Sequence, residues 1–331
     1  MNEKKITLAL LYGGQGCESE VSVRGAKNLL PILSEMFNCL PILIQKDGSW
    51  ILHKNQVFTT KLQGRGGFFC PKTEEFYSVD CAFPLLHGDY GEDGIIQSAL
   101  ELASIPFIGC DGRTGAICRD KAIVKSVAKG LNIPILPYIL VNRYETDIIE
   151  RAESELGYPL FVKPATLGSS FGTLEARDRD QLIKAIENAA ALSKRIVIEK
   201  LLEPKRELEC GYFQAKSQEL FTNPGEILCG STLYDFESKY NKSTITTADA
   251  KLDGKIKEKI KDYSQKLVRY LGVRDLCRID FFLSGEDLYF NEINTMPGFT
   301  SGSLYADLLK NAGYSITDLL RSLVLQAISR T

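Results

Sequence analysis

The first 110 residues alternate between apolar runs and amphipathic stretches. Runs typical of buried strands cover residues 6–14, 37–45, 79–88 and 105–110. Helical spacing of apolar residues follows the first and third runs, over 19–36 and 93–104, and 48–53 has the pattern of a short edge strand. Strands that alternate with helices predict a small, open, parallel α/β domain, with its chemistry in the loops at the carboxyl ends of the strands.

Residues 111–202 lose this rhythm and have the pattern of a mixed α+β segment. Helices are expected over 113–132, 144–157 and 178–192, and strands over 133–141 and 195–202. The remaining stretch, 159–176, predicts a β-hairpin with a glycine-rich loop at its tip.

The last segment, 203–331, is richer in β-type alternation. Strands are expected over 207–215 and 219–228, helices over 253–272 and 315–330 (capped by Ser315), and a hairpin that turns at Gly285 over 276–298. The polar, aromatic stretch 231–250 has no periodicity and is longer than an ordinary connection, so we predict a lid there. The chain therefore divides into predicted domains at 1–110, 111–202 and 203–331.

Composition and charge narrow the class of protein. The 331 residues are 44% hydrophobic and 25% charged, as in ordinary globular proteins. The formal net charge of −2 argues against nucleic acid or an anionic membrane as the main partner. The first apolar run ends at a glycine turn and is interpreted as a strand rather than a signal peptide, and no apolar run approaches the ~20 residues that cross a bilayer. We expect a cytoplasmic protein.

The nine cysteines form no Cys-x-x-Cys pair, and several lie in apolar runs. We interpret them as reduced thiols, as expected in the cytoplasm. A zinc site is not expected, because the two histidines, His53 and His87, lie far from any cysteine pair.

The tip of the 159–176 hairpin carries the first candidate chemistry. Lys163 follows a buried strand, where a lysine is costly unless something negative meets it. The loop behind it contains Gly168, Ser169, Ser170 and Gly172, and such a loop can turn its backbone N–H groups toward an anion. The pattern predicts a phosphate site.

The final hairpin carries the second group of candidate residues. Arg278 and Asp280 lie two residues apart on one strand, and Glu292 and Asn294 do so on the next, so the four side chains converge if the strands pair. Two carboxylates and an amide oxygen suit Mg²⁺. The alternative is a surface hairpin with alternating polar residues. The Pro-Gly turn and hydroxyl groups of NTMPGFTSGS (294–303), directly after the hairpin, favour a functional site.

Together these features suggest a nucleotide held between two β-rich layers. The chain has no G-x-x-x-x-G-K-[ST] phosphate loop and no G-x-G-x-x-G after the first strand. Two common nucleotide-binding folds are therefore disfavoured.

The assembly resembles the ATP-grasp superfamily and, within it, the D-alanine–D-alanine ligase family. The resemblance covers nearly the whole chain, with blocks in family order: LYGGQGCESEVS, FPLLHGDYGEDGIIQSALELASIPFIGC, KPATLGSSFG, YDFESKY, and CRIDFFL with NEINTMPGFTSGSLY. The HGxxGEDG block and the long C-terminal block are specific. The resemblance implies an ATP-grasp fold in which two α+β lobes, after a small parallel α/β domain, clamp ATP.

The family resemblance implies ATP-dependent ligation of two D-alanines through a D-alanyl phosphate, for peptidoglycan precursors, in a homodimer. The implied ATP-binding residues are Lys121, Lys163, Ser170, Glu199, Lys200, Leu202, Glu207 and Lys239. The implied ligands of two Mg²⁺ ions, or of Mn²⁺, are Asp280, Glu292 and Asn294.

The same resemblance implies the reaction site. Arg278 and the backbone N–H of Gly298 would stabilise the acyl phosphate and the tetrahedral species. The implied residues around the two D-alanines are Glu18 and His87 for the first, with Ser169 and Tyr240 hydrogen-bonded to Glu18, and Ser303 and Leu304 for the second.

Some of these residues also have structural interpretations. Glu18 is in a first helical turn, where acids are favoured anyway. His87 could cap a turn, Lys121 could be a solvated helix lysine, and Tyr240 could be ordinary lid packing. The chain also departs from the family pattern, because Ser19, Ala306 and the segment STITTADA (243–250) replace residues that are common there.

Rival functions stay open at this point. A D-alanine–D-serine or D-alanine–D-lactate ligase would share the fold, but the apolar Leu304 and the retained Lys239 and Tyr240 favour D-alanine. Another ATP-grasp amino-acid ligase, or a non-catalytic nucleotide-binding protein, is disfavoured because the family blocks, the metal ligands and Arg278 are all present.

Overall fold

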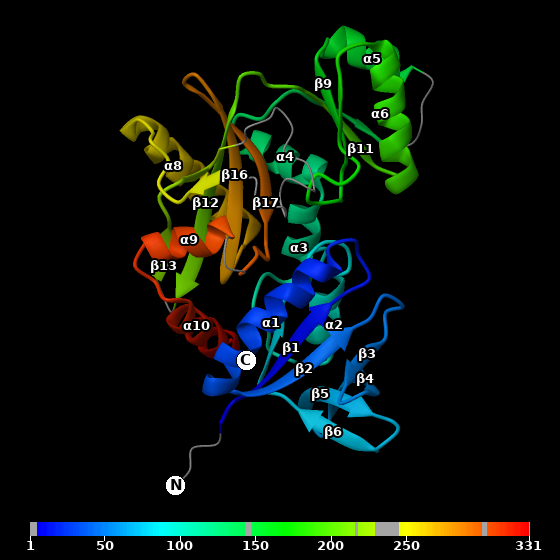
Figure 1. Cartoon of the computed structure of the whole chain (residues 1–331), viewed down its shortest axis with the longest axis vertical. Helices are drawn as coiled ribbons and strands as arrows, with labels where there is room; N and C mark the ends of the chain where they lie inside the picture. The colour runs from blue at the N-terminus through cyan, green and yellow to red at the C-terminus, as the bar shows by residue number, and fades with distance from the viewer. Residues whose placement is uncertain (1–4, 143–146, 216–217, 229–244, 300–302, 331) are drawn as a thin grey trace.

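We describe a computed structural model of the chain, covering residues 5–142, 147–215, 218–228, 245–299 and 303–330. These residues form three β-sheets (Figure 1). Each sheet is built from one of the three ranges predicted as domains, while the boundaries themselves stay a prediction.

The first sheet has the strand order β6-β5-β4-β3-β2-β1-β7. Its strands are β1 (Thr7–Gly13), β2 (Asn38–Ile44), β3 (Trp50–Leu52), β4 (Asn55–Leu62), β5 (Arg65–Cys70), β6 (Glu75–Ser78) and β7 (Cys81–Pro84). As predicted, β1 is parallel to its neighbours β2 and β7. Helices α1 (Ser19–Met36) and α2 (Ile95–Leu102) follow β1 and β7.

Two expectations for this sheet were wrong. The stretch 48–53 is not at an edge, because β3 pairs with β2 and β4, and three further antiparallel strands follow it. These strands turn at His53-Lys54 and at Gln63-Gly64, where all four φ angles are positive. Such two-residue turns usually carry Asn-Gly, so the first of them gave little signal. The stretch 105–110 contributes only an isolated bridge between Ala82 and Phe107.

The second sheet is antiparallel, with the order β10-β9-β11-β8. Its strands are β8 (Tyr138–Val141), β9 (Leu160–Pro164), β10 (Leu174–Ala176) and β11 (Ile196–Lys200). The predicted hairpin is confirmed, since β9 pairs with β10 across the glycine loop. Helices α5 (Ile148–Glu155) and α6 (Arg179–Leu192) lie with this sheet in a lobe of their own (Figure 1). The lobe has its own apolar core, which includes Val162, Leu182 and Ile198.

The helix predicted over 113–132 is two helices, α3 (Gly112–Arg119) and α4 (Lys121–Gly130). Asp120 separates them with an extended backbone, and its carboxylate accepts hydrogen bonds from the N–H groups of Ala122 and Ile123. The same carboxylate pairs with Arg195 Nε at 2.7 Å. The helical spacing of apolar residues continues through the break, so the sequence pattern did not reveal it.

Replacing Asp120 with alanine should lower the free energy of unfolding by about 1–2 kcal/mol, because α4 loses its N-terminal cap. Asp120→Asn can still cap the helix but loses the charge that pairs with Arg195, and so should cost less. Chemical denaturation of both variants measures the difference. Equal losses would show that the ion pair, and not the cap, carries the stabilisation.

The third sheet has the order β15-β14-β12-β16-β17, with β13 also paired to β12. Its strands are β12 (Arg206–Ala215), β13 (Gln218–Phe221), β14 (Gly225–Leu228), β15 (Ile245–Thr247), β16 (Leu276–Ser284) and β17 (Asp287–Asn294). The single strand expected over 219–228 is therefore two, β13 and β14. Helix α8 (Gly254–Leu271) begins at the cap Asp253 and ends at the left-handed Gly272. Of the predicted lid, 231–244 lies outside the described residues, and the described remainder contains strand β15, which pairs with β14.

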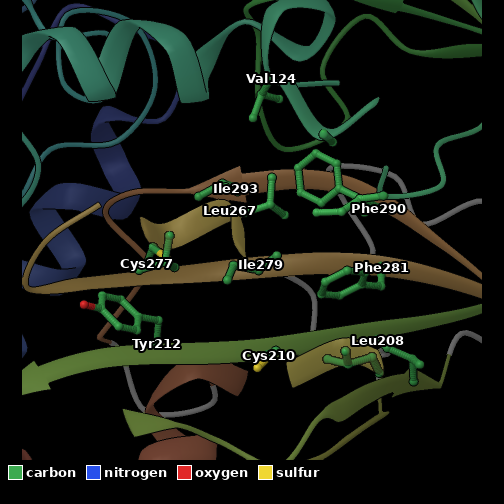
Figure 2. Packing of buried hydrophobic residues seen from close by; sticks show 14 of the residues in the cluster. Val124, Leu208, Cys210, Tyr212, Leu267, Cys277, Ile279, Phe281, Phe290 and Ile293 are labelled. Atoms are coloured by element: carbon green, nitrogen blue, oxygen red, sulfur yellow. The ribbon is translucent and has the colours of Figure 1, made fainter. Parts of the chain in front are cut away.

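The core of this sheet joins several segments. Figure 2 shows apolar side chains from β12, β16 and β17 packed with Leu267 of α8 and Val124 of α4. Helix α9 (Leu304–Asn311) was not predicted, whereas α10 (Ile316–Ile328) was, with Ser315 accepting a hydrogen bond from the Asp318 N–H as expected.

A second core cluster is shared between the first and third sheets. It contains Leu8, Leu10 and Phe83 from the first sheet, Phe213 and Leu276 from the third, and Leu320, Leu323 and Val324 from α10. Next to it, the fully buried Asp275 accepts a 2.6 Å hydrogen bond from the Gly109 N–H and pairs with Arg330. The two sheets are thus joined by both apolar and polar contacts.

The described cysteines are free thiols, and six of these eight are buried; Cys229 lies outside the described range. Among the described residues, no helix has the length and apolar character needed to span a membrane.

Candidate active site

A cleft opens between the second and third sheets. Its walls come from β9 and the glycine loop on one side and from β12, β14, β16 and β17 on the other, with Lys121 at the start of α4. The predicted residues that line it are Lys121, Lys163, Ser169, Ser170, Glu207, Arg278, Asp280 and Glu292. Side chains that are far apart in sequence thus meet in one place.

Lys163 is held by a buried carboxylate. Its Nζ lies 2.6 Å from Glu199 Oε2, and the Nζ of Lys125 lies 2.6 Å from Glu199 Oε1. Burial raises the pKa of Glu199, but the two lysines outweigh burial and lower it to about 2. Burial lowers the pKa of Lys125 to about 8. The Glu199 carboxylate is therefore a support for Lys163 rather than a group that lines the cleft.

The final hairpin places its carboxylates as predicted. Asp280 and Glu292 are directly opposite each other on β16 and β17. Asp280 accepts two hydrogen bonds from Arg278, at 2.8 and 2.7 Å, and Glu209 of β12 lies 3.2 Å from the same guanidinium. Burial disfavours the charge of Arg278, but these carboxylates hold its pKa well above the ordinary value. Lys121 Nζ lies 3.2 Å from Glu292.

A β-bulge changes the side chains that this hairpin presents. The register shifts after Asp280, so that Asn291 has no partner residue in the pairing with β16. Phe290 is therefore buried in the core while Asn291 and Glu292 both reach the cleft. Asn294, the third predicted metal ligand, is opposite Arg278, and its Oδ1 accepts a 3.1 Å hydrogen bond from the Met296 N–H. It does not line this cleft.

The glycine loop reaches across to the first sheet. Ser169 and Ser170 have positive φ angles, as does Gly172. Ser169 Oγ donates a hydrogen bond to Glu18, the residue directly before α1. The predicted contact between Ser169 and Glu18 is present; Tyr240 and Lys239 lie outside the described residues.

His87, Lys200 and Leu202 were also predicted as site residues, but they do not line the cleft. His87, three residues after β7, is buried and lines a separate hollow with Gln15 and Asp89. Lys200 donates hydrogen bonds to the carbonyls of Gly157 and Tyr158, and Leu202 lies two residues after the end of β11.

Ser303 and Leu304 begin α9. Ser303 Oγ donates a hydrogen bond to the carbonyl of Gly298. Leu304 is buried, and a Cβ added to Gly225 would lie 3.0 Å from its Cδ1. The side chain of Leu304 packs against β14. If Leu304 contacts the carboxylate of a substrate, it does so through its backbone N–H, which lies at the start of the helix.

Two family models match the chain, over residues 7–110 (D-ala D-ala ligase N-terminus) and 127–325 (D-ala D-ala ligase C-terminus). The chain belongs to the D-alanine–D-alanine ligase family. A D-alanine--D-alanine ligase of Deinococcus radiodurans is 36% identical, with 97% of this chain and 98% of that protein covered. The corresponding ligase of Caldicellulosiruptor bescii is 34% identical, with 98% and 96% covered.

Solved structures agree with this family assignment. D-alanyl-alanine synthetase A of Vibrio cholerae superposes with a TM-score of 0.89 at 31% identity, covering 98% of this chain and 99% of that one. VanG D-Ala:D-Ser ligase of Enterococcus faecalis does so with a TM-score of 0.88 at 28% identity, covering 98% and 100%. The ATP-grasp fold expected from the sequence is confirmed.

Sequence reasoning missed several charged or polar residues of the site. Lys125 is one helical turn after Lys121, and Glu209 is two residues after Glu207 on one strand, so both lie on the same face as a predicted residue. That spacing could have found them. The position of Asn291 in the site depends on the bulge, and that of Arg119 depends on the break between α3 and α4. Neither irregularity has a signal in the sequence.

Proposed function

We propose that this protein ligates two D-alanines into D-alanyl-D-alanine at the expense of ATP, in the cytoplasm, for peptidoglycan precursor synthesis. The observation that carries the proposal is the cleft, where Lys121, Lys163 and Arg278 face the paired carboxylates Asp280 and Glu292. The Glu18–Ser169 hydrogen bond links this cleft to the first sheet. Family membership supports the substrate class.

The basic side chains of the cleft suit a reaction between two anionic reactants, ATP and the carboxylate of an amino acid. In the proposed reaction the γ-phosphoryl group of ATP moves to the carboxylate of the first D-alanine, and ADP leaves. The amine of the second D-alanine then attacks the acyl carbon and phosphate leaves. Lys121 and Lys163 would hold the ATP phosphates, and Arg278, with the Gly298 N–H, would stabilise the charge that develops on the acyl group. A lid within the predicted range 231–250, before β15, would keep water from the acyl phosphate.

The chemistry of the donor set fits Mg²⁺ or Mn²⁺. Asp280 and Glu292 supply hard oxygen ligands from facing strands, and Asn294 is the proposed third ligand. No three His, Cys, Asp or Glu side chains of the described chain gather into a complete metal site. This matches a cation that takes one or two carboxylates and completes its shell with phosphate oxygens and water. When bound, it would neutralise phosphate charge.

A close backbone approach supports the role of the glycine loop. A Cβ added to Gly168 would lie 3.0 Å from both Arg119 Nη1 and Glu18 Oε2. Gly168→Ala should therefore displace the loop and reduce kcat/KM for D-alanine by about 10- to 100-fold, since small misplacements are costly in catalysis. Steady-state kinetics measures this.

Gly130→Ala is the matched control for that variant. The added Cβ has no atom within 4 Å, so activity should be unchanged. A Gly168→Ala enzyme as active as Gly130→Ala would remove the loop from the proposed site.

The D-alanine–D-serine alternative rests on one observation, the similarity to the Enterococcus faecalis D-Ala:D-Ser ligase. The buried, apolar Leu304 favours D-alanine, because a polar or charged side chain at this position would need a partner. The expected homodimer is likewise a proposal, which the molar mass in solution would test.

Phosphate release from ATP and Mg²⁺ tests the substrate class. We expect release with D-alanine alone, with the dipeptide identified by mass, and none with L-alanine. Release that requires D-serine or D-lactate would leave the ATP site intact and overturn the reading of Leu304. No release with any D-amino acid would overturn the proposed function.

A further inference from the structure

Arg119 lies at the meeting point of three segments that the proposed reaction brings together. It ends α3, and only 11% of its side chain is exposed. Its guanidinium nitrogens lie 3.4 Å from Asp89, 3.5 Å from Glu92 and 3.7 Å from Glu18. The carboxylates come from the loop after β7 and from the start of α1. No other basic side chain of the described chain is paired with these three.

The negative charges around Arg119 outnumber its single positive charge. Three carboxylates face one guanidinium, and burial raises the pKa of Glu92 and of Asp89. Although burial disfavours the charge of Arg119, Glu92, Glu18 and Asp89 together raise its pKa. Without Arg119, the buried carboxylates of Glu18 and Glu92 would repel each other, and Glu18 would lose the cation that fixes its position.

The glycine loop sits directly on this ion pair. Both Arg119 Nη1 and Glu18 Oε2 would lie 3.0 Å from a Cβ at Gly168. Ser169 donates its hydrogen bond to the other oxygen, Glu18 Oε1. Two residues beyond Arg119, Lys121 Nζ donates a 2.7 Å hydrogen bond to the carbonyl of Leu167 in the same loop. The segment 119–121 therefore supports both the glycine loop and Glu18, the carboxylate that the loop contacts.

We infer that Arg119 is a positioning residue for the proposed ligation, which orients Glu18 beneath the glycine loop so that it meets the ammonium group of the first amino-acid substrate. The inference rests on the proposed function. Arg119 does not line the cleft that would hold ATP, so its loss should affect amino-acid binding more than ATP binding.

Steady-state kinetics of Arg119→Met and Arg119→Lys tests the inference. Arg119→Met should raise KM for the first D-alanine at least tenfold while KM for ATP changes less than twofold. Arg119→Lys should recover part of the loss, because it keeps the charge without the planar fork. The control is Arg113→Met, since Arg113 lies on the same helix and is exposed, and its KM values should not change.

A double-mutant cycle with Glu18→Gln separates positioning from general structural support. If Arg119 acts through Glu18, the two substitutions raise KM by much less together than the product of their separate effects. Multiplicative effects, or equal changes in the KM of ATP and D-alanine, would overturn the inference. If Arg119→Met does not fold, the same cycle with Arg119→Lys decides. Wild-type enzyme that turns over no amino acid would instead refute the proposed function.

Discussion

Replacing Arg278 with alanine should reduce turnover about 100- to 1,000-fold, while the affinity for ATP changes less than about threefold. The guanidinium is fixed by Asp280 on its own strand and by Glu209 on β12, so it is oriented before any substrate arrives. A charge oriented in advance stabilises the transition state without reorganising. Single-turnover measurements and equilibrium ATP binding separate the two effects.

Two variants control for lost stability in that experiment. Arg278→Lys retains a charge but cannot form the same pair of hydrogen bonds, and should lose less turnover than alanine. Arg206→Ala removes a comparable pair, because Arg206 donates two 2.7 Å hydrogen bonds to Glu226 in the same sheet, and neither residue lines the cleft. If Arg206→Ala lowers turnover as much as Arg278→Ala does, the effect is one of folding.

Replacing Glu199 with glutamine should lower the free energy of unfolding at pH 7 by about 3–5 kcal/mol, the usual cost of breaking a buried ion pair. The loss leaves Lys125 and Lys163 buried beside each other without their shared carboxylate. Denaturant titration measures the change. Glu203→Gln is the matched control: its ion pair with Arg177 is largely exposed, and its loss should cost at most about 1 kcal/mol.

The stability difference between wild type and Glu199→Gln should depend on pH. The pKa of Glu199 is about 2 when folded and 4.5 ordinarily, so the unfolded chain binds the extra proton first on acidification. The stabilisation is therefore complete above about pH 4.5 and is lost as the pH falls toward 2. A difference that stays constant from pH 6 to pH 3 would contradict the ionised pair.

Much of the site was predictable because its chemistry is local in sequence. Arg278 with Asp280, and Glu292 with Asn294, are encoded by the period of two along strands and by one tight turn. The phosphate-binding character of the glycine loop depends on consecutive residues. Family blocks then supplied the distant Glu18, which no local pattern connects to Ser169.

What could not be predicted depends on long-range packing or on single-residue irregularities. The bulge at Asn291 shifts the alternation by one residue, and the break at Asp120 occurs within an unbroken apolar period. The pairing of Lys125 with Glu199, the carboxylate that also holds Lys163, requires that α4 pack against β11, which no short stretch encodes.

The core that joins the first and third sheets has a mechanical consequence. With apolar packing shared across them and Asp275 bonded to Gly109 and Arg330, these sheets form one stiff block. The lobe of the second sheet keeps its own core and meets this block through polar contacts, among them Ser169 with Glu18 and Glu199 with Lys125 of α4. A displacement of the lobe relative to the block would break these contacts between Ser169 and Glu18 and between Lys125 and Glu199.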